Sequence, residues 1–325
     1  MTQASIPDLR AFLGHLQRDG DVAVVEAPVD PRLEVAEIHR RVIAAGGPAL
    51  LFSNPVGSAY PLVTNLFGTS RRAEAAFGRK PFRLIERLVA LSQDLVPPTL
   101  PSLWAARDVA WEALRIGTSK TGRGPITQRV SRDVDLRQLP VITSWPDDGG
   151  PFLTLPLVFT EHPKGVGHNL GMYRMQVHDH RSTGMHWQIG KGGGFHYAVA
   201  EELQQPLPAT VYLGGPPALI LAAVAPLPEN VPELMLASLI AGRKLRVCAG
   251  PDDRSLLADC EFALGGRVPE GLRRTEGPFG DHYGYYSLAH PYPVFEVEWM
   301  ACREDAIYPA TVVGKPRQED FFIGD

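Results

Sequence analysis

The spacing of apolar residues over the first 120 or so positions alternates between a helical and a strand period. Leu9, Phe12, Leu13 and Leu16 recur at i, i+3, i+4 and i+7, which predicts a helix that Gly20 ends. Similar patterns predict strands over 22–25, 49–52 and 60–64, and helices over 33–45 and through most of 71–113. This alternation predicts a small N-terminal α/β domain over residues 1–125.

The pattern changes near residue 127, after which short apolar runs are separated by Gly, Pro and Asp. We expect strands over 155–160, 171–177, 209–213, 245–248, 261–264 and 294–300, and helices over 195–203, 218–224 and 233–240. Many short strands with few long helices predict a sheet-rich barrel or sandwich over residues 126–313. Residues 314–325 show neither pattern and are predicted to be a connector.

Composition excludes several classes of protein. The chain of 325 residues has 32 basic and 36 acidic side chains, a net charge of −4, so a nucleic-acid partner has little electrostatic support. There is no apolar run long enough to span a membrane and no visible secretory signal. Three isolated cysteines disfavour a disulfide framework or a thiolate zinc site and fit a reducing cytoplasm, which is the predicted location.

Histidine is concentrated in one part of the chain. Six of the ten histidines fall within 35 residues: His162, His168, His178, His180, His186 and His196. Their spacing matches no metal motif, so a set of scattered surface histidines is the simpler interpretation. Lys191 is followed by three glycines, an arrangement that either cradles a phosphate or forms a flexible turn.

Two carboxylates lie five residues apart in the segment TEGPFGDHYGYY. Glu276 and Asp281 flank a Gly-Pro-Phe-Gly turn, which can direct both side chains to one point. Paired acids beside a cation allow one to stay protonated while the other is ionised. The alternative is a surface turn with two solvated acids.

Five segments together resemble the UbiD family of decarboxylases, which use prenylated FMN. They are NLFGTSRR (65–72), LPVITSWPDDGGP (139–151), NLGMYRMQ (169–176), GMHWQIGKGG (184–193) and EGPFGDHYGYY (276–286). The resemblance covers nearly the whole chain. It implies an α+β fold in which the N-terminal α/β domain is followed by a split β-barrel, similar to flavin reductases, that binds the cofactor.

The resemblance also implies a metal site and a flavin site. Asn169, His186 and Glu233 match the family's ligands for Mn²⁺ or Mg²⁺, with K⁺ often nearby; oxygen ligands suit such hard cations. The residues matching the flavin-binding segments are Met172, Tyr173, Arg174, His186, Trp187, Gln188, Lys191 and Gly192. Arg174, Glu276 and Asp281 match the family's catalytic network, with Asp281 at the proton-donor position.

The function implied by the resemblance is reversible, non-oxidative decarboxylation of an aromatic, heteroaromatic or α,β-unsaturated acid. A UbiX-type flavin prenyltransferase would supply the cofactor. Relative to the family pattern PAxAEIVLEG, residues 257–266 carry Leu257 and Gly265, at no assigned catalytic position. The family's C-terminal domain, which covers the active site and forms most of the homo-oligomer surface, is expected to be missing after Asp325. A flavin-binding module without turnover and an FMN-dependent oxidoreductase therefore stay as alternatives.

Overall fold

A computed structural model describes residues 6–78, 116–187, 192–227 and 231–324. The N-terminal part holds helices α1 (Leu9–Arg18), α2 (Glu34–Ala44) and α3 (Ser70–Phe77) and strands β1 (Val22–Val25), β2 (Ala49–Phe52) and β3 (Leu62–Thr64). These elements confirm the predicted alternation. Asp8 caps α1 by accepting from the N–H of Ala11 (2.8 Å), which satisfies one free donor of the first turn. Most of the helical pattern predicted within 71–113 lies outside the described residues.

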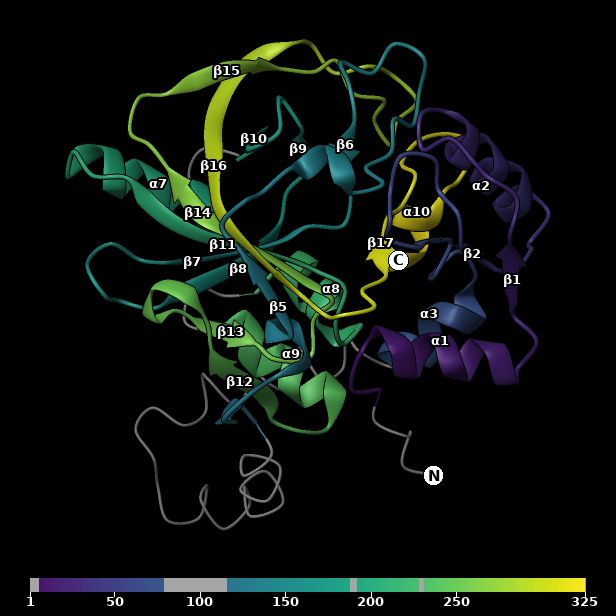
Figure 1. Cartoon of the computed structure of the whole chain (residues 1–325), viewed down its shortest axis with the longest axis horizontal. Helices are drawn as coiled ribbons and strands as arrows, with labels where there is room; N and C mark the ends of the chain where they lie inside the picture. Colours follow the sequence, from purple (N-terminus) through teal and green to yellow (C-terminus); the bar gives the residue numbers. More distant parts are fainter. Residues whose placement is uncertain (1–5, 79–115, 188–191, 228–230, 325) are drawn as a thin grey trace.

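A four-stranded sheet joins the two ends of the chain. Its order is β1-β2-β3-β17, where β17 (Tyr308–Pro309) runs parallel to β3. Figure 1 shows the yellow elements β17 and α10 lying among the purple and blue N-terminal ones. Strand β17 falls in the range that we predicted for the second domain, so the N-terminal sheet is completed by residues nearly 250 positions later.

The remaining strands form mainly one antiparallel sheet. It contains β5 (Arg129–Ser131), β7 (Leu157–Glu161), β8 (His168–Met172), β10 (Ser182–Gly184), β11 (Leu207–Leu213), β14 (Phe262–Val268), β15 (Arg273–Glu276) and β16 (His290–Cys302). The order is β10-β16-β14-β11-β7-β8, with β15 and β5 also paired to β16. In the described part of the chain no ladder joins β8 to β10, so hydrogen bonding leaves this sheet open. The predicted α+β class is confirmed, and the split barrel stays a prediction.

One predicted strand divides in two at the site. The run 171–177 becomes β8 and β9 (Met175–Gln176), and β9 pairs with β6 (Phe152–Leu153) rather than with β7. Tyr173 and Arg174 therefore lie outside both ladders, which frees their backbone from the pleat of the sheet.

Helices and a small sheet cover the large one. They are α7 (Gly192–Glu202), α8 (Ala218–Val224), α9 (Glu233–Ala241), β4 (Thr118–Lys120), β12 (Leu245–Ala249) and β13 (Ser255–Leu257), with short 3₁₀ turns at Pro125–Thr127, Leu136–Gln138 and Pro251–Asp253. All three predicted helices are confirmed. Helix α8 packs on β8 and α9, which places the start of α9 beside the strand that carries Asn169.

The segment over 314–325, which we predicted to be a connector, contains a short helix. Helix α10 (Glu319–Gly324) forms there and contacts α3 and α8. Tertiary contacts stabilise this helix: Glu319 is fully buried and accepts hydrogen bonds from Phe67 and Thr311. A six-residue helix has no periodic pattern that sequence reasoning could detect, because isolated helices of this length are unstable in water.

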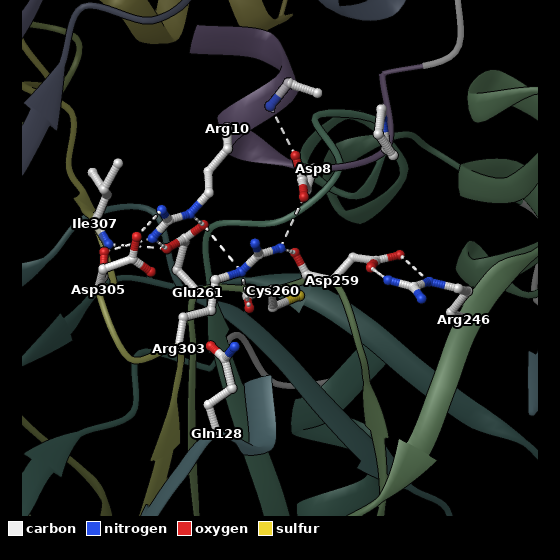
Figure 2. A network of polar contacts seen from close by, with 12 residues as sticks. Asp8, Arg10, Gln128, Arg246, Asp259, Cys260, Glu261, Arg303, Asp305 and Ile307 are labelled. Carbon is white, nitrogen blue, oxygen red and sulfur yellow. Dashed lines mark hydrogen bonds and ion pairs between the residues drawn. The ribbon is translucent and has the colours of Figure 1, made fainter. Parts of the chain in front are cut away.

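A polar network ties α1 to the large sheet (Figure 2). The buried carboxylate of Glu261 accepts from Arg10 (3.1 Å), forms an ion pair with Arg303 (3.3 Å) and accepts the backbone N–H of Ile307 (2.9 Å). Arg303 also donates to Asp8, the cap of α1 (2.9 Å). Buried charges with this many partners fix the N-terminal helix in one orientation.

The three cysteines, Cys248, Cys260 and Cys302, are free and buried. Within the described ranges, none of the helices has both the length and the apolar character needed to cross a bilayer.

Candidate active site

Arg174 lies in the break between β8 and β9 and is held on several sides. Its Nε donates to Oε1 of Glu276 (3.3 Å), and its Nη2 donates to Oγ of Ser287 (3.0 Å). The guanidinium carbon lies 4.5 Å from the ring centre of Phe279, a cation–π distance. The Arg174 side chain keeps 16% of its surface exposed, while Glu276 is fully buried. The guanidinium is therefore oriented by the protein and still open to a ligand.

Glu276 ends strand β15 and brings a second predicted residue into contact. The Nδ1 of His186 donates to the same Oε1 (2.8 Å), and the ring of His186 lies 4.2 Å from that of Tyr292. The other carboxylate oxygen, Oε2, is buried without a hydrogen-bond partner among the described residues. Arg174, Glu276 and His186 thus form one contact set, although 90 or more residues separate Glu276 from the other two.

The turn that follows Glu276 is clamped by the loop that carries LPVITSWPDDGGP. Gln176 donates from Nε2 to the carbonyl of Gly149 (2.6 Å) and accepts the N–H of Gly277 (2.7 Å). The N–H of Gly149 in turn donates to the carbonyl of Pro278 (2.7 Å). A side chain at Gly149 would lie 2.2 Å from the carbonyl oxygen of Gly277, so this close approach requires glycine.

Asp148 completes the clamp. Its Oδ1 accepts the N–H of Gly280 (2.8 Å), and its Oδ2 accepts those of Ser144 (3.0 Å) and Trp145 (2.9 Å). Burial raises the pKa of Asp148, and the three backbone hydrogen bonds oppose that shift. Asp148 and Gly280, 132 residues apart in the sequence, are therefore joined directly, and their two loops are fixed against each other.

Asp281, the second carboxylate of this turn, forms no hydrogen bond or ion pair with Glu276 or Arg174 among the described residues. Asp281 is 36% exposed and forms an ion pair with its neighbour His282. Its carbonyl accepts the N–H of Gly284 (2.8 Å) and its N–H donates to the carbonyl of Tyr285 (2.8 Å). These local hydrogen bonds hold Asp281 in a tight turn with its side chain partly exposed.

A glycine-rich helix terminus faces a second group of predicted residues. The N–H of Gly193 donates to Oη of Tyr173 (3.2 Å), and Asn169 donates to the same oxygen (3.4 Å). A Cβ on Gly192 would lie 2.5 Å from Oδ1 of Asn169, and one on Gly193 would lie 2.6 Å from Nε1 of Trp187. That Nε1 is buried without a partner among the described residues. The N-terminus of α7, together with the free indole N–H of Trp187 beside it, suits a phosphate.

Glu233, the first residue of α9, reaches the same strand. Its carboxylate accepts the N–H of Leu170, next to Asn169, and burial is the largest cause that raises its pKa. Its Oε2 is buried and unpartnered among the described residues. Glu233 thus binds the residue next to Asn169 on β8, whereas His186 is bonded to Glu276. No cluster of three or more His, Cys, Asp or Glu side chains in the described ranges is able to hold a metal.

The other predicted site residues are less informative. Met172 packs against the hydrophobic core beside α8. Gln188 and Lys191 lie outside the described residues. Of the histidines expected at the surface, His162 and His196 are buried, with rings 5.1 Å apart.

Sequence reasoning missed four residues that support Arg174 and Glu276. Gln176 and Phe279 lie inside two of the five family-like segments, Ser287 lies one residue beyond the segment that holds Phe279, and Tyr292 lies on β16. The family-like segments indicated where along the chain three of these residues lie. Their contacts depend on pairings between distant strands, which no local pattern reveals.

The fold and site define a mixed α/β protein with an oriented arginine–glutamate pair and a glycine-rich helix terminus. The chain belongs to the UbiD family: residues 118–316 match the 3-octaprenyl-4-hydroxybenzoate carboxy-lyase Rift-related domain, and residues 13–92 match the N-terminal domain of the same carboxy-lyase.

Individual relatives and solved structures support this family membership. A Chlamydia pneumoniae protein, named as one of the subunits of a 4-hydroxybenzoate decarboxylase, is 50% identical over 320 residues, which is 98% of this chain and 54% of that protein. The chain thus spans about half the length of such curated relatives. The UbiD-class enzyme HmfF from Pelotomaculum thermopropionicum, solved with prFMN, has a TM-score of 0.82 at 26% identity over 98% of this chain and 69% of its own. Vanillic acid decarboxylase of Sedimentibacter hydroxybenzoicus, 24% identical with a TM-score of 0.83 over 97% of this chain and 66% of its own, shares the fold.

Proposed function

We propose that this chain carries the flavin site of an enzyme that decarboxylates an aromatic, heteroaromatic or α,β-unsaturated acid, reversibly and without oxidation. The observation that carries the proposal is the Arg174–Glu276 pair, whose guanidinium is fixed by Glu276, Ser287 and Phe279 yet partly exposed. A fixed, exposed guanidinium is suited to bidentate binding of a carboxylate.

The residues present fit prenylated FMN. Gly192, Gly193 and the free Nε1 of Trp187 would hold its phosphate, and the free Oε2 of Glu233 with Asn169 would hold Mn²⁺ or Mg²⁺ against that phosphate. Because the protein would supply only two ligands, the cofactor's oxygens would have to complete the coordination of this ion. A nearby K⁺ would help to offset the negative charge of the phosphate. The bound cofactor supplies an acceptor for the electron pair left when CO₂ departs. We also propose that the second domain forms a split β-barrel and that a UbiX-type flavin prenyltransferase supplies the cofactor.

The chain's own residues orient the substrate and move the proton. Arg174 binds the substrate carboxylate. Glu276 accepts from both Arg174 and His186, so its role is to hold the guanidinium in place. Asp281 remains our proposed proton donor, because it occupies the donor position of the family motif.

The test is to load the purified chain with prenylated FMN and measure CO₂ release from a panel of hydroxybenzoic, furoic and cinnamic acids. We expect release from at least one acid in the wild type and none from Arg174→Leu. The proposal would be contradicted if this chain and a longer relative, such as the Chlamydia pneumoniae protein, both bound flavin tightly but released no CO₂. Flavin reduction by NADH, followed in the visible spectrum, would instead indicate an oxidoreductase.

A further inference from the structure

Two buried polar atoms beside the Arg174 site lack partners. They are Oε2 of Glu276 and Nε2 of His178, and neither has a hydrogen-bond partner among the residues that the structure describes. Burying a polar group without a partner costs about 1–3 kcal/mol. Native proteins usually avoid this cost with an ordered water.

Both atoms face the same glycine. A Cβ on Gly184, the last residue of β10, would lie 2.5 Å from Oε2 of Glu276 and 3.3 Å from Nε2 of His178. The two atoms are therefore no farther apart than the sum of these distances, about 5.8 Å, a span that one water can bridge. Any larger residue at position 184 would fill the space beside the carboxylate.

The surroundings of His178 favour a neutral ring that carries one N–H. Burial first, and then the charge of Arg274, lower the pKa of His178, while Glu276 and Asp179 act in the opposite direction. Arg274 donates to Asp179 (2.7 Å) and to Ser182 (3.0 Å). The backbone of His178 is fixed by its hydrogen bond to the carbonyl of Ser182 (2.9 Å).

We infer that His178 is a positioning residue, whose Nε2–H donates through one water, held against Gly184, to Oε2 of Glu276. This inference rests on the proposed function, because its purpose is to orient Glu276 against Arg174. Glu276 then has a donor on each oxygen: Arg174 and His186 on Oε1, and the water on Oε2. A carboxylate held from both sides cannot rotate away from the guanidinium.

The first experiment measures turnover in the chain loaded with prenylated FMN. His178→Leu should lower kcat about 10-fold with little change in KM, the size usual for outer hydrogen-bond partners. His178→Gln, whose amide donates from nearly the same place, should recover most of the loss. Gly184→Ala should act like His178→Leu. The matched control is His180→Gln, an exposed histidine of the same turn, which should match the wild type. Equal loss in His178→Gln and His178→Leu would overturn the role.

A second experiment works without turnover and separates this inference from the proposed function. Two-dimensional ¹H–¹⁵N spectra of the histidine rings report which nitrogen carries the proton. We expect the Nε2–H form for His178, with a ring shift that changes in Glu276→Gln but not in Asp281→Asn. An Nδ1–H ring would leave no donor for the water and would overturn the inference even in an active enzyme. The expected spectrum in an inactive chain would contradict only the proposed function.

Discussion

The carboxylate of Glu319, in the last helix, accepts a 2.7 Å hydrogen bond from the backbone N–H of Phe67, in the N-terminal part of the chain. Its other oxygen accepts from the hydroxyl of Thr311 (2.7 Å), and the side chain is fully buried. Strand β17 and helix α10 are therefore part of the N-terminal unit, and an ionisable group lies at that junction.

Stability should depend on pH through Glu319. Burial raises its pKa to about 7, against the opposing effects of Thr311, Phe67 and the charge of Arg72. Because the folded state holds this proton more tightly than the unfolded state, the stabilisation is complete below about pH 4.5 and is lost as the pH rises toward about 7. Glu319→Gln should remove this loss, which is on the order of 3 kcal/mol at most. Urea unfolding of both proteins between about pH 4.5 and 8 measures it; parallel curves would contradict the prediction.

Removal of Glu261 should destabilise the protein strongly. Glu261→Ala removes one of the two carboxylates that pair with the buried guanidinium of Arg303, leaving only Asp8, and frees Arg10 from the sheet (Figure 2). Breaking a buried pair on one side costs about 3–5 kcal/mol. Asp305→Asn is the control, since Asp305 also binds Arg10 but is 74% exposed, and its loss should cost under about 1 kcal/mol. Denaturant midpoints compare the two, and similar losses would show that burial of Glu261 is not decisive.

Flavin retention should depend on Glu233 and Gly192. Glu233→Ala removes a ligand oxygen, and Gly192→Ala places a methyl group 2.5 Å from Oδ1 of Asn169. Each should weaken loading with prenylated FMN about 10- to 100-fold without unfolding the protein. Glu202→Ala, at the exposed end of α7, is the control. Absorbance and metal analysis after gel filtration give the measurement; normal loading in Glu233→Ala would exclude Glu233 from the site.

Proton delivery should separate Asp281 from Glu276. Asp281→Asn keeps the shape of the turn but cannot release a proton, so it should bind flavin normally and lose about 10²- to 10⁴-fold in turnover. Exchange of solvent deuterium into the product carbon should disappear with it. Exchange that survives in Asp281→Asn and vanishes in Glu276→Gln would reverse the two roles.

The amino-acid sequence alone determined the elements whose signal is local. The i, i+3, i+4, i+7 spacing from Leu9 to Leu16 predicted α1, and the apolar run from Ala218 predicted α8, because a buried face imposes its period on neighbouring residues. The family-like segments contain Arg174, Glu276 and Gly192, three residues of the candidate site.

Only the tertiary structure decided which of these residues meet. It paired Glu276 with Arg174 and His186 and left Asp281 at the surface, because strand pairing places Glu276 inside the sheet while local turn bonds hold Asp281 outside. It likewise placed His178 opposite Glu276 across Gly184, and formed α10 around the buried Glu319. Contacts between residues about 90 to 250 positions apart depend on register and burial, which no local pattern of side chains encodes.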